Sequence, residues 1–218
     1  VYNGTSWVNE GVLVESEART NLITYSRPDD TNWAKGGVVV TENASGVTAP
    51  NGEENFTFFK EDATTAVHFF SDSSSFTSGV TYTFSGFVKK ATDDEIIQIT
   101  FASAAFGSSQ YANFNASTGE FETVVGLTTH VEDWGSGIYR VGITAAATAS
   151  TSGNAGFILT SNDDSLGRTP TYAGDDTNGF YVWGAQTEEG STPSSYSPTN
   201  GSTVTRSADS ITVPSAKL

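Results

Sequence analysis

Short apolar runs with a period of two residues dominate the sequence. In residues 81–89, Tyr82, Phe84 and Val88 alternate with polar or small residues, and residues 97–101 and 139–145 show the same alternation. Successive side chains of a β-strand point to opposite faces of a sheet, so this period predicts strands with one buried face. A helix does not fit the pattern, because its apolar residues recur every three or four positions.

Turn-forming residues separate these runs along the whole chain. Clusters of Gly, Asn, Asp and Ser bound them, and no window shows helical periodicity over three turns. Further strands are predicted at residues 38–41, 56–60, 66–70, 113–116, 119–123, 156–160 and 180–186, and loops at 44–55, 162–178 and 190–201. Many short strands bury their apolar faces by packing one sheet on another. We therefore predict an all-β fold, a two-sheet antiparallel β-sandwich of the jelly-roll type.

The length of 218 residues suffices for one sandwich with short appendages. We expect a jelly-roll domain at residues 27–190, preceded by leading strands or a linker at 1–26 and followed by an extended C-terminal segment at 191–218. Apolar residues 12–14 predict a strand pair within the first 20 residues. The chain begins at Val1 and contains no methionine, so we expect a fragment or a processed product of a longer chain.

Charge and composition exclude several partners. The net charge of -15, from 10 basic and 25 acidic residues, repels phosphate backbones, so no nucleic acid is expected as a partner. The same field disfavours anionic glycans unless cations bridge them. No run approaches the roughly 20 apolar residues that cross a bilayer, so no membrane insertion is expected. The absence of cysteine excludes disulfides and thiolate metal sites and is compatible with an extracellular location.

The sequence offers little catalytic chemistry. Its two histidines lie far apart, with His68 in a predicted strand and His130 expected at a sheet edge. Neither zinc-type spacing nor a G-x-S-x-G elbow occurs. Glycoside hydrolysis needs two carboxyl groups that face each other across a sugar, but the E-x-D-x-x-E pattern of jelly-roll glucanases is absent. We therefore predict that the protein is not an enzyme. A polysaccharide hydrolase or lyase stays open as the weaker alternative.

Aromatic residues outside the apolar strand faces are the better functional candidates. The chain has four Trp, eight Tyr and fourteen Phe, and flat aromatic rings suit the C–H faces of sugars. The aromatic residues on polar strand faces or in loops are predicted to bind ligand: Phe87, Tyr111, Trp134 and Tyr172. Polar residues on strands whose other face is apolar are predicted to assist them: Gln98, Asn113 and Arg140. The alternatives are that Trp134 covers the end of the core and that the polar residues form a solvated sheet face.

Several longer stretches resemble segments of one known family. Residues 11–22, which contain Gly-Val-Leu-Val-Glu and Ala-Arg-Thr-Asn-Leu, are similar to a segment common in phage structural proteins. Asn32-Trp33-Ala34-Lys35 looks like the segment that follows it. Later strands match at residues 82–89, 132–141, 180–190 and 195–206. Over about residues 11–210, the chain resembles the carbohydrate-binding-module-like jelly rolls, similar to families 4, 9 and 22, of phage tail, fibre and head-decoration proteins.

This resemblance implies a galactose-binding-like or concanavalin-like jelly-roll sandwich. It also implies binding of a polysaccharide or cell-surface glycan, on a virion or in a secreted protein. The acidic charge favours a neutral glycan. Possible further partners are other copies of the chain or other virion proteins, and a purely structural virion domain is the main alternative. Related modules often hold a structural calcium (Ca2+), for which Glu188 or Asp209 are candidate ligands. Trp33, Tyr139 and Trp183 match fold-forming aromatics of the family, whereas Trp134 departs from its pattern.

Overall fold

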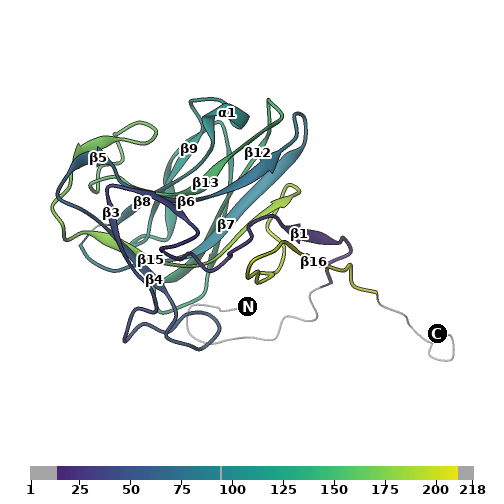
Figure 1. The fold of residues 1–218 in the computed structure, drawn as a ribbon, viewed down its shortest axis with the longest axis horizontal. Helices are drawn as coiled ribbons and strands as arrows, with labels where there is room; N and C mark the ends of the chain where they lie inside the picture. Colours follow the sequence, from purple (N-terminus) through teal and green to yellow (C-terminus); the bar gives the residue numbers. More distant parts are fainter. Residues whose placement is uncertain (1–13, 94, 211–218) are drawn as a thin grey trace.

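Two antiparallel six-stranded sheets form the protein in the computed structural model, which describes residues 14–93 and 95–210 (Figure 1). One sheet, called the β8 sheet, has the order β10 (Glu120–Val125), β9 (Tyr111–Asn115), β8 (Ile96–Phe101), β13 (Thr151–Leu159), β6 (Phe69–Phe76), β2 (Ala34–Gly36). The other, called the β7 sheet, has the order β11 (Thr128–Asp133), β12 (Ile138–Ala146), β7 (Thr81–Lys90), β15 (Gly179–Glu189), β4 (Thr57–Glu61), β3 (Val38–Thr41). The predicted jelly-roll β-sandwich is confirmed.

Smaller elements complete the fold. Two short strand pairs lie outside the main sheets: β1 (Arg19–Asn21) with β16 (Val204–Arg206), and β5 (Thr65–Val67) with β14 (Thr171–Ala173). The helix α1 (Ser103–Phe106) is a single turn. Within the described residues, no helix is long and apolar enough to cross a membrane.

The core lies between the two sheets and combines aromatic rings with aliphatic side chains. Phe84 and Phe157 lie 5.4 Å apart between ring centroids, and Trp33 stacks almost parallel to Phe157, with an interplanar angle of 9°. Tyr82, Phe84 and Val88 of β7 all face this core, as their alternation predicts. Each fully buried large apolar side chain contributes about 1.5–3 kcal/mol to folding.

Two strands escape the alternation signal. The second half of β6 reads Asp-Ser-Ser-Ser-Phe, yet it pairs with β13 as far as Phe76. β11 carries polar residues on both faces because it is an edge strand, bonded only to β12. The predicted strand at 66–70 is divided into β5 and β6 at His68, whose imidazole contacts the Gly37 carbonyl.

The chain ends are built into the sandwich through β15. The buried Asn21 amide donates to the carbonyls of Ala185 (3.3 Å) and Ser197 (2.9 Å) and accepts from the N–H groups of Ile23 (3.1 Å) and Thr187 (3.2 Å). β1 thus pairs with the C-terminal β16 and docks on β15. Residues 1–13, with most of the expected leading strand pair, and residues 211–218 lie outside the described residues. The boundaries at 27 and 190 stay a prediction.

Candidate functional site

A second aromatic cluster lies on the outer face of the β7 sheet, away from the core. Its buried floor is Phe87, and Trp134, Trp183 and Tyr196 surround this ring in edge-to-face contact at centroid distances of 5.0, 5.4 and 6.3 Å. Trp183 and Tyr196 also contact each other at 4.8 Å. We call these four residues the aromatic cluster. Trp134 and Tyr196 are half-buried, and Trp183 is almost fully buried beside Phe87.

The backbone of β15 shapes this cluster. Trp183 pairs with Phe87 across the strands, and the register of β15 against β7 shifts between Trp183 and Gln186. Gly184 lies inside this irregularity with a φ of 58°, and a Cβ there would come within 2.9 Å of the Phe87 ring. A glycine is required both by the positive φ and by the close approach of the ring. The bulge lets Trp183 lie on the outer face while Val182 and Ala185 remain in the core.

Arg140 supports the cluster from below. Its guanidinium donates to the Ser194 carbonyl (2.6 Å) and the Ser85 hydroxyl (3.2 Å) and lies 5.7 Å from the Phe87 ring centroid. Burial lowers the pKa of Arg140, while the charges of Glu132, Glu188 and Glu15 act to raise it. The side chain is only 5% exposed, so it fixes the 190–200 loop to the sheet rather than standing free on it.

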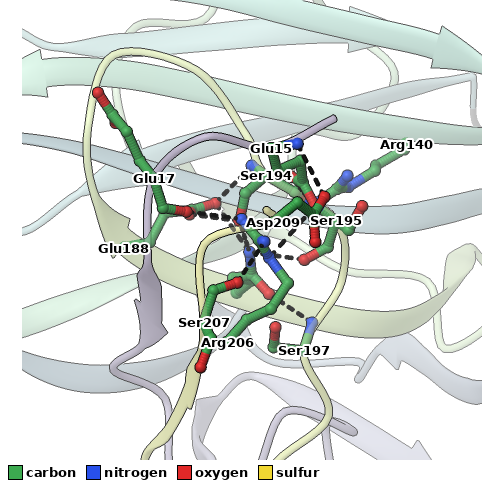
Figure 2. Close-up of polar contacts among 11 residues, drawn as sticks. Glu15, Glu17, Arg140, Glu188, Ser194, Ser195, Ser197, Arg206, Ser207 and Asp209 are labelled. Atoms are coloured by element: carbon green, nitrogen blue, oxygen red, sulfur yellow. Dashed lines mark hydrogen bonds and ion pairs between the residues drawn. The ribbon is translucent and has the colours of Figure 1, made fainter. Parts of the chain in front are cut away.

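A network of polar contacts, called the polar latch, connects this loop to both chain ends (Figure 2). Its members are Glu15, Gln186, Glu188, Ser194, Ser195 and Arg206. The buried Glu188 carboxylate accepts from the Gln186 amide (2.8 Å) and from the N–H (2.8 Å) and hydroxyl (2.6 Å) of Ser194. Glu15 accepts from the Ser195 N–H (2.7 Å) and pairs with Arg206 at 3.2 Å. The latch therefore makes the shape of the aromatic cluster depend on segments nearly 200 residues apart in sequence.

The two expected calcium ligands do not fit that role. Glu188 accepts three hydrogen bonds from protein donors, and Asp209 accepts one from the Glu15 N–H at 2.9 Å. Calcium needs six to eight oxygen ligands that converge on one point. Among the described residues, no group of three or more carboxylate or histidine side chains converges in this way.

Three adjoining hollows run along the aromatic cluster. The central hollow, of about 480 Å³, is lined by Phe87, Glu132, Trp134, Arg140 and Tyr196, with Glu15 and residues 193–195. The rim hollow, of about 450 Å³, lies beside it and is lined by residues 46–50 with Lys89, Trp134, Ser136 and Ile138. The end hollow, of about 470 Å³, is lined by Tyr25, Ser26, Arg27, Asp29, Asn51, Asn55, Trp183, Tyr196 and residues 198–200. Trp134 is shared by the rim and central hollows, and Tyr196 by the central and end hollows.

Two residues that line the end hollow carry buried polar groups without a partner. The Trp183 Nε1–H and the Asn55 Oδ1 are buried and have no hydrogen-bond partner among the described residues. Each side chain is only 7% exposed. An unpaired buried donor or acceptor costs about 1–3 kcal/mol, so such groups call for an explanation when they share one hollow. A ligand that supplies one acceptor and one donor would satisfy both.

Of the predicted site residues, the structure brings Phe87, Trp134 and Arg140 together at the central hollow. The prediction placed all three side chains on an open surface, but two of them are buried. Phe87 is 1% exposed, because Trp134, Trp183 and Tyr196 cover it, and Arg140 is buried under the 190–200 loop. Trp134 is the half-buried member, and its indole N–H donates to Glu132 at 3.2 Å.

The other four predicted residues lie elsewhere. Gln98 and Asn113 are on the outer face of the β8 sheet, but the 160–170 loop covers them: Gln98 donates to the Gly167 carbonyl (3.2 Å), and Asn113 donates to the Asp164 carboxylate (3.0 Å). The expected open sheet face is therefore closed at this point. Tyr111 is half-buried at the start of β9. Tyr172 lies in β14 rather than in a loop, where it donates to Glu61 at 2.6 Å and contacts His68.

The β8 sheet has an outer hollow of its own, of about 420 Å³, lined largely by apolar side chains including Phe69, Phe101 and Ile158. Its arginine, Arg168, is already engaged, because it donates to the Thr100 hydroxyl (2.9 Å) and the Phe101 carbonyl (2.7 Å). Buried unpaired groups occur on the β8 sheet as well, at Asp72 and Ser74, but neither residue lines this hollow. The aromatic walls shared between adjoining hollows therefore distinguish the β7 sheet.

Sequence reasoning missed Tyr25, Asn55 and Tyr196, and it assigned Trp183 only to the fold. The sequence does carry a signal for Trp183. In residues 180–186, Phe180 and Val182 alternate toward the core, which leaves Trp183 on the opposite face. Tyr196 has no comparable signal, because its position depends on the fold of a Ser- and Pro-rich loop.

Comparison with known proteins gives likenesses of fold only. No family model matches the chain, and no curated protein matches it. A solved xylan-binding domain from Paenibacillus barcinonensis, a family 22 carbohydrate-binding module, is 12% identical, with a TM-score of 0.46 over 84% of this chain and 100% of that one. A family 22 module joined to the catalytic module of an endo-1,4-β-D-xylanase from Clostridium thermocellum, in complex with xylohexaose, is 14% identical, with a TM-score of 0.34 over 84% of this chain and 30% of that one. At this similarity, neither structure assigns a family or a ligand to the chain.

Proposed function

We propose that this chain is a non-catalytic glycan-binding module whose binding surface is the outer face of the β7 sheet. One observation carries the proposal: three hollows of similar size adjoin each other along one sheet face and share aromatic walls. Aromatic faces stack on the C–H faces of sugar rings, and polar groups around them meet the hydroxyls. A row of hollows suits consecutive sugars of a polysaccharide better than a single small molecule.

The net charge of the chain supports a mostly neutral polysaccharide, and the hollows offer polar groups to its hydroxyls. Glu132, Lys89 and Asn55 offer charged or amide groups beside the rings, and the chain as a whole carries a charge of -15. Affinity for one chain segment is expected in the micromolar to millimolar range, about -8 to -4 kcal/mol. We further propose a virion tail, fibre or head-decoration protein, or a secreted protein, as the setting. Many copies displayed there would raise the avidity.

Calorimetric titration against a panel of neutral and anionic polysaccharides, with xylan included, tests the proposal. Trp134→Ala removes the wall shared by the rim and central hollows, so it should weaken binding at least tenfold. Tyr111→Ala is the control, because this half-buried aromatic lies on the β8 sheet, and its affinity should equal that of the wild type. Absence of binding to every glycan, or equal binding by Trp134→Ala and wild type, would refute the assignment.

An enzymatic role requires two carboxyl groups across a bound sugar, and Glu15 and Glu132 both line the central hollow. Glu15, however, is tied to the Ser195 N–H and to Arg206. We therefore propose no catalysis. Assay of reducing ends or unsaturated products after incubation with each bound polysaccharide tests this, and product release would overturn it.

A structural role is the second candidate, favoured by exposed apolar residues on edge strands. Val124 of β10 and Val131 of β11 are 42% and 45% exposed, and each lies at the edge of its sheet. Open edges can pair with a second chain. Light scattering decides between the two functions: a stable oligomer together with no glycan binding would favour assembly.

A further inference from the structure

Arg27, which lines the end hollow, is the one lysine or arginine among the described residues that has no partner. Every other arginine and lysine in the described part of the chain forms a hydrogen bond or an ion pair, whereas the exposed Arg27 forms neither. Burial raises the pKa of the Tyr196 hydroxyl, and the Arg27 charge is among the influences that lower it, so the guanidinium acts on the ring that walls this hollow. In a chain of net charge -15, an unpaired arginine beside a hollow is unusual.

Two buried groups at the same hollow independently indicate a ligand. The Trp183 Nε1–H can donate a hydrogen bond and the Asn55 Oδ1 can accept one, and both are unpaired although their side chains are 93% buried. The hydroxyls of a sugar act as donors and acceptors at once, so adjacent hydroxyls match this pair. The rings of Tyr25, Trp183 and Tyr196 supply apolar walls in the same place.

No acidic group of the described residues forms an ion pair with Arg27. Asp29 also lines the end hollow, but its carboxylate accepts from the N–H groups of Thr31 (2.9 Å) and Asn32 (2.6 Å) and from the Asn32 amide (3.0 Å). Charges elsewhere on the surface are screened beyond roughly 8 Å at physiological ionic strength. An arginine guanidinium binds a carboxylate through two parallel, charge-assisted hydrogen bonds, whereas a neutral sugar offers no opposite charge.

We propose that the end hollow is a subsite for a uronic acid residue of the glycan. Arg27 pairs with the sugar carboxylate, and the sugar hydroxyls satisfy the Trp183 Nε1–H and the Asn55 Oδ1. The proposal rests on the proposed function and refines its ligand to a mostly neutral polysaccharide that bears an acidic residue. It assigns the charged contact to one end of the binding face, and the central and rim hollows take the neutral part.

NMR titration of the Trp183 indole N–H with single sugars tests the subsite. The probes are glucose with glucuronate and galactose with galacturonate, which differ within each pair only in the carboxylate, and sodium acetate as the carboxylate alone. One of the two uronates should bind at least fivefold more tightly than its neutral partner. Arg27→Gln should abolish that difference, and Lys35→Gln, which removes the same charge from an exposed lysine paired with Asp30, should preserve it.

The outcomes separate this proposal from the proposed function. Equal affinity for uronate and neutral sugar, an acetate response as large as that of the uronates, or no response of Trp183 to any sugar would overturn the acidic subsite. Binding of polysaccharide that depends on Trp134 would still stand in each of these cases. Absence of all glycan binding would remove both proposals.

Discussion

The indole of Trp134 stands at 87° to the buried ring of Phe87, with 5.0 Å between the ring centroids. This contact links a surface loop to the floor of the outer face of the β7 sheet. Because Phe87 also contacts Trp183 and Tyr196, one buried ring sets the positions of all three aromatic walls. The walls of the three hollows therefore share one buried support.

Phe87→Ala should lower both stability and glycan binding. Removal of a fully buried phenylalanine costs about 3–5 kcal/mol in the free energy of unfolding, and here it also leaves three rings without support. Phe87→Leu keeps most of the volume and should cost less than about 1.5 kcal/mol. Chemical denaturation measures the stabilities and calorimetry the affinities. A Phe87→Ala protein with full affinity would show that the floor does not position the walls.

Asn21→Ala should detach the chain ends from β15. The substitution removes four hydrogen bonds and leaves buried backbone groups unpaired, so we expect a loss of about 3 kcal/mol in the free energy of unfolding. Thr20→Ala is the control, because this neighbour makes one side-chain hydrogen bond, to Thr205 at 2.7 Å. The loss of this single exposed bond should lower the free energy of unfolding by about 1 kcal/mol or less. Similar losses for both variants would contradict the role of Asn21.

Asp72 should make the protein less stable as the pH rises from about 4 to about 6. Burial raises the pKa of this carboxyl to about 6, from an unfolded value of 3.8. The folded state therefore holds the proton more tightly in this window, which stabilises the fold below pH 4 and no longer does so above pH 6. Asp72→Asn should remove this part of the pH dependence and raise stability at neutral pH. Urea unfolding from pH 4 to pH 7 checks both.

Asp175 supplies the control of opposite sign. Hydrogen bonds from Thr177 and Asn178 hold the pKa of Asp175 near 2, below its unfolded value of 3.8. Its stabilisation is present above about pH 4 and is lost as the pH falls toward 2. Asp175→Asn should therefore destabilise the protein at neutral pH, where Asp72→Asn stabilises it. Effects of the same sign at pH 7 would contradict the burial of Asp72.

The sequence predicts the fold well because the core strands carry their own periodic signal. Tyr82, Phe84 and Val88 of β7 point into the core as the alternation requires. The second half of β6 and all of β11 could not be found in this way. Their residues are polar on both faces, and they are strands because the backbone groups of β13 and β12 pair with them.

The site was harder to predict because no periodic pattern in the sequence shows which residues of a sheet a loop will cover. Gln98 and Asn113 read as a solvated sheet face, but the 160–170 loop folds over them and takes their hydrogen bonds. Phe87 reads as an exposed ring for the same reason, since its cover comes from Trp134 and Tyr196 in other segments. Only the bulge at Gly184 and the Ser- and Pro-rich loop bring Trp183 and Tyr196 together.

Chemical-shift mapping of backbone amides with the tightest-binding oligosaccharide tests most directly whether ligand lies on the outer face of the β7 sheet. The account predicts that the largest shifts cluster around Trp134, Trp183 and Tyr196, and that amides around Arg168 on the β8 sheet stay unchanged. Shifts concentrated at the β8 sheet hollow, with none near Trp134 and Trp183, would contradict it.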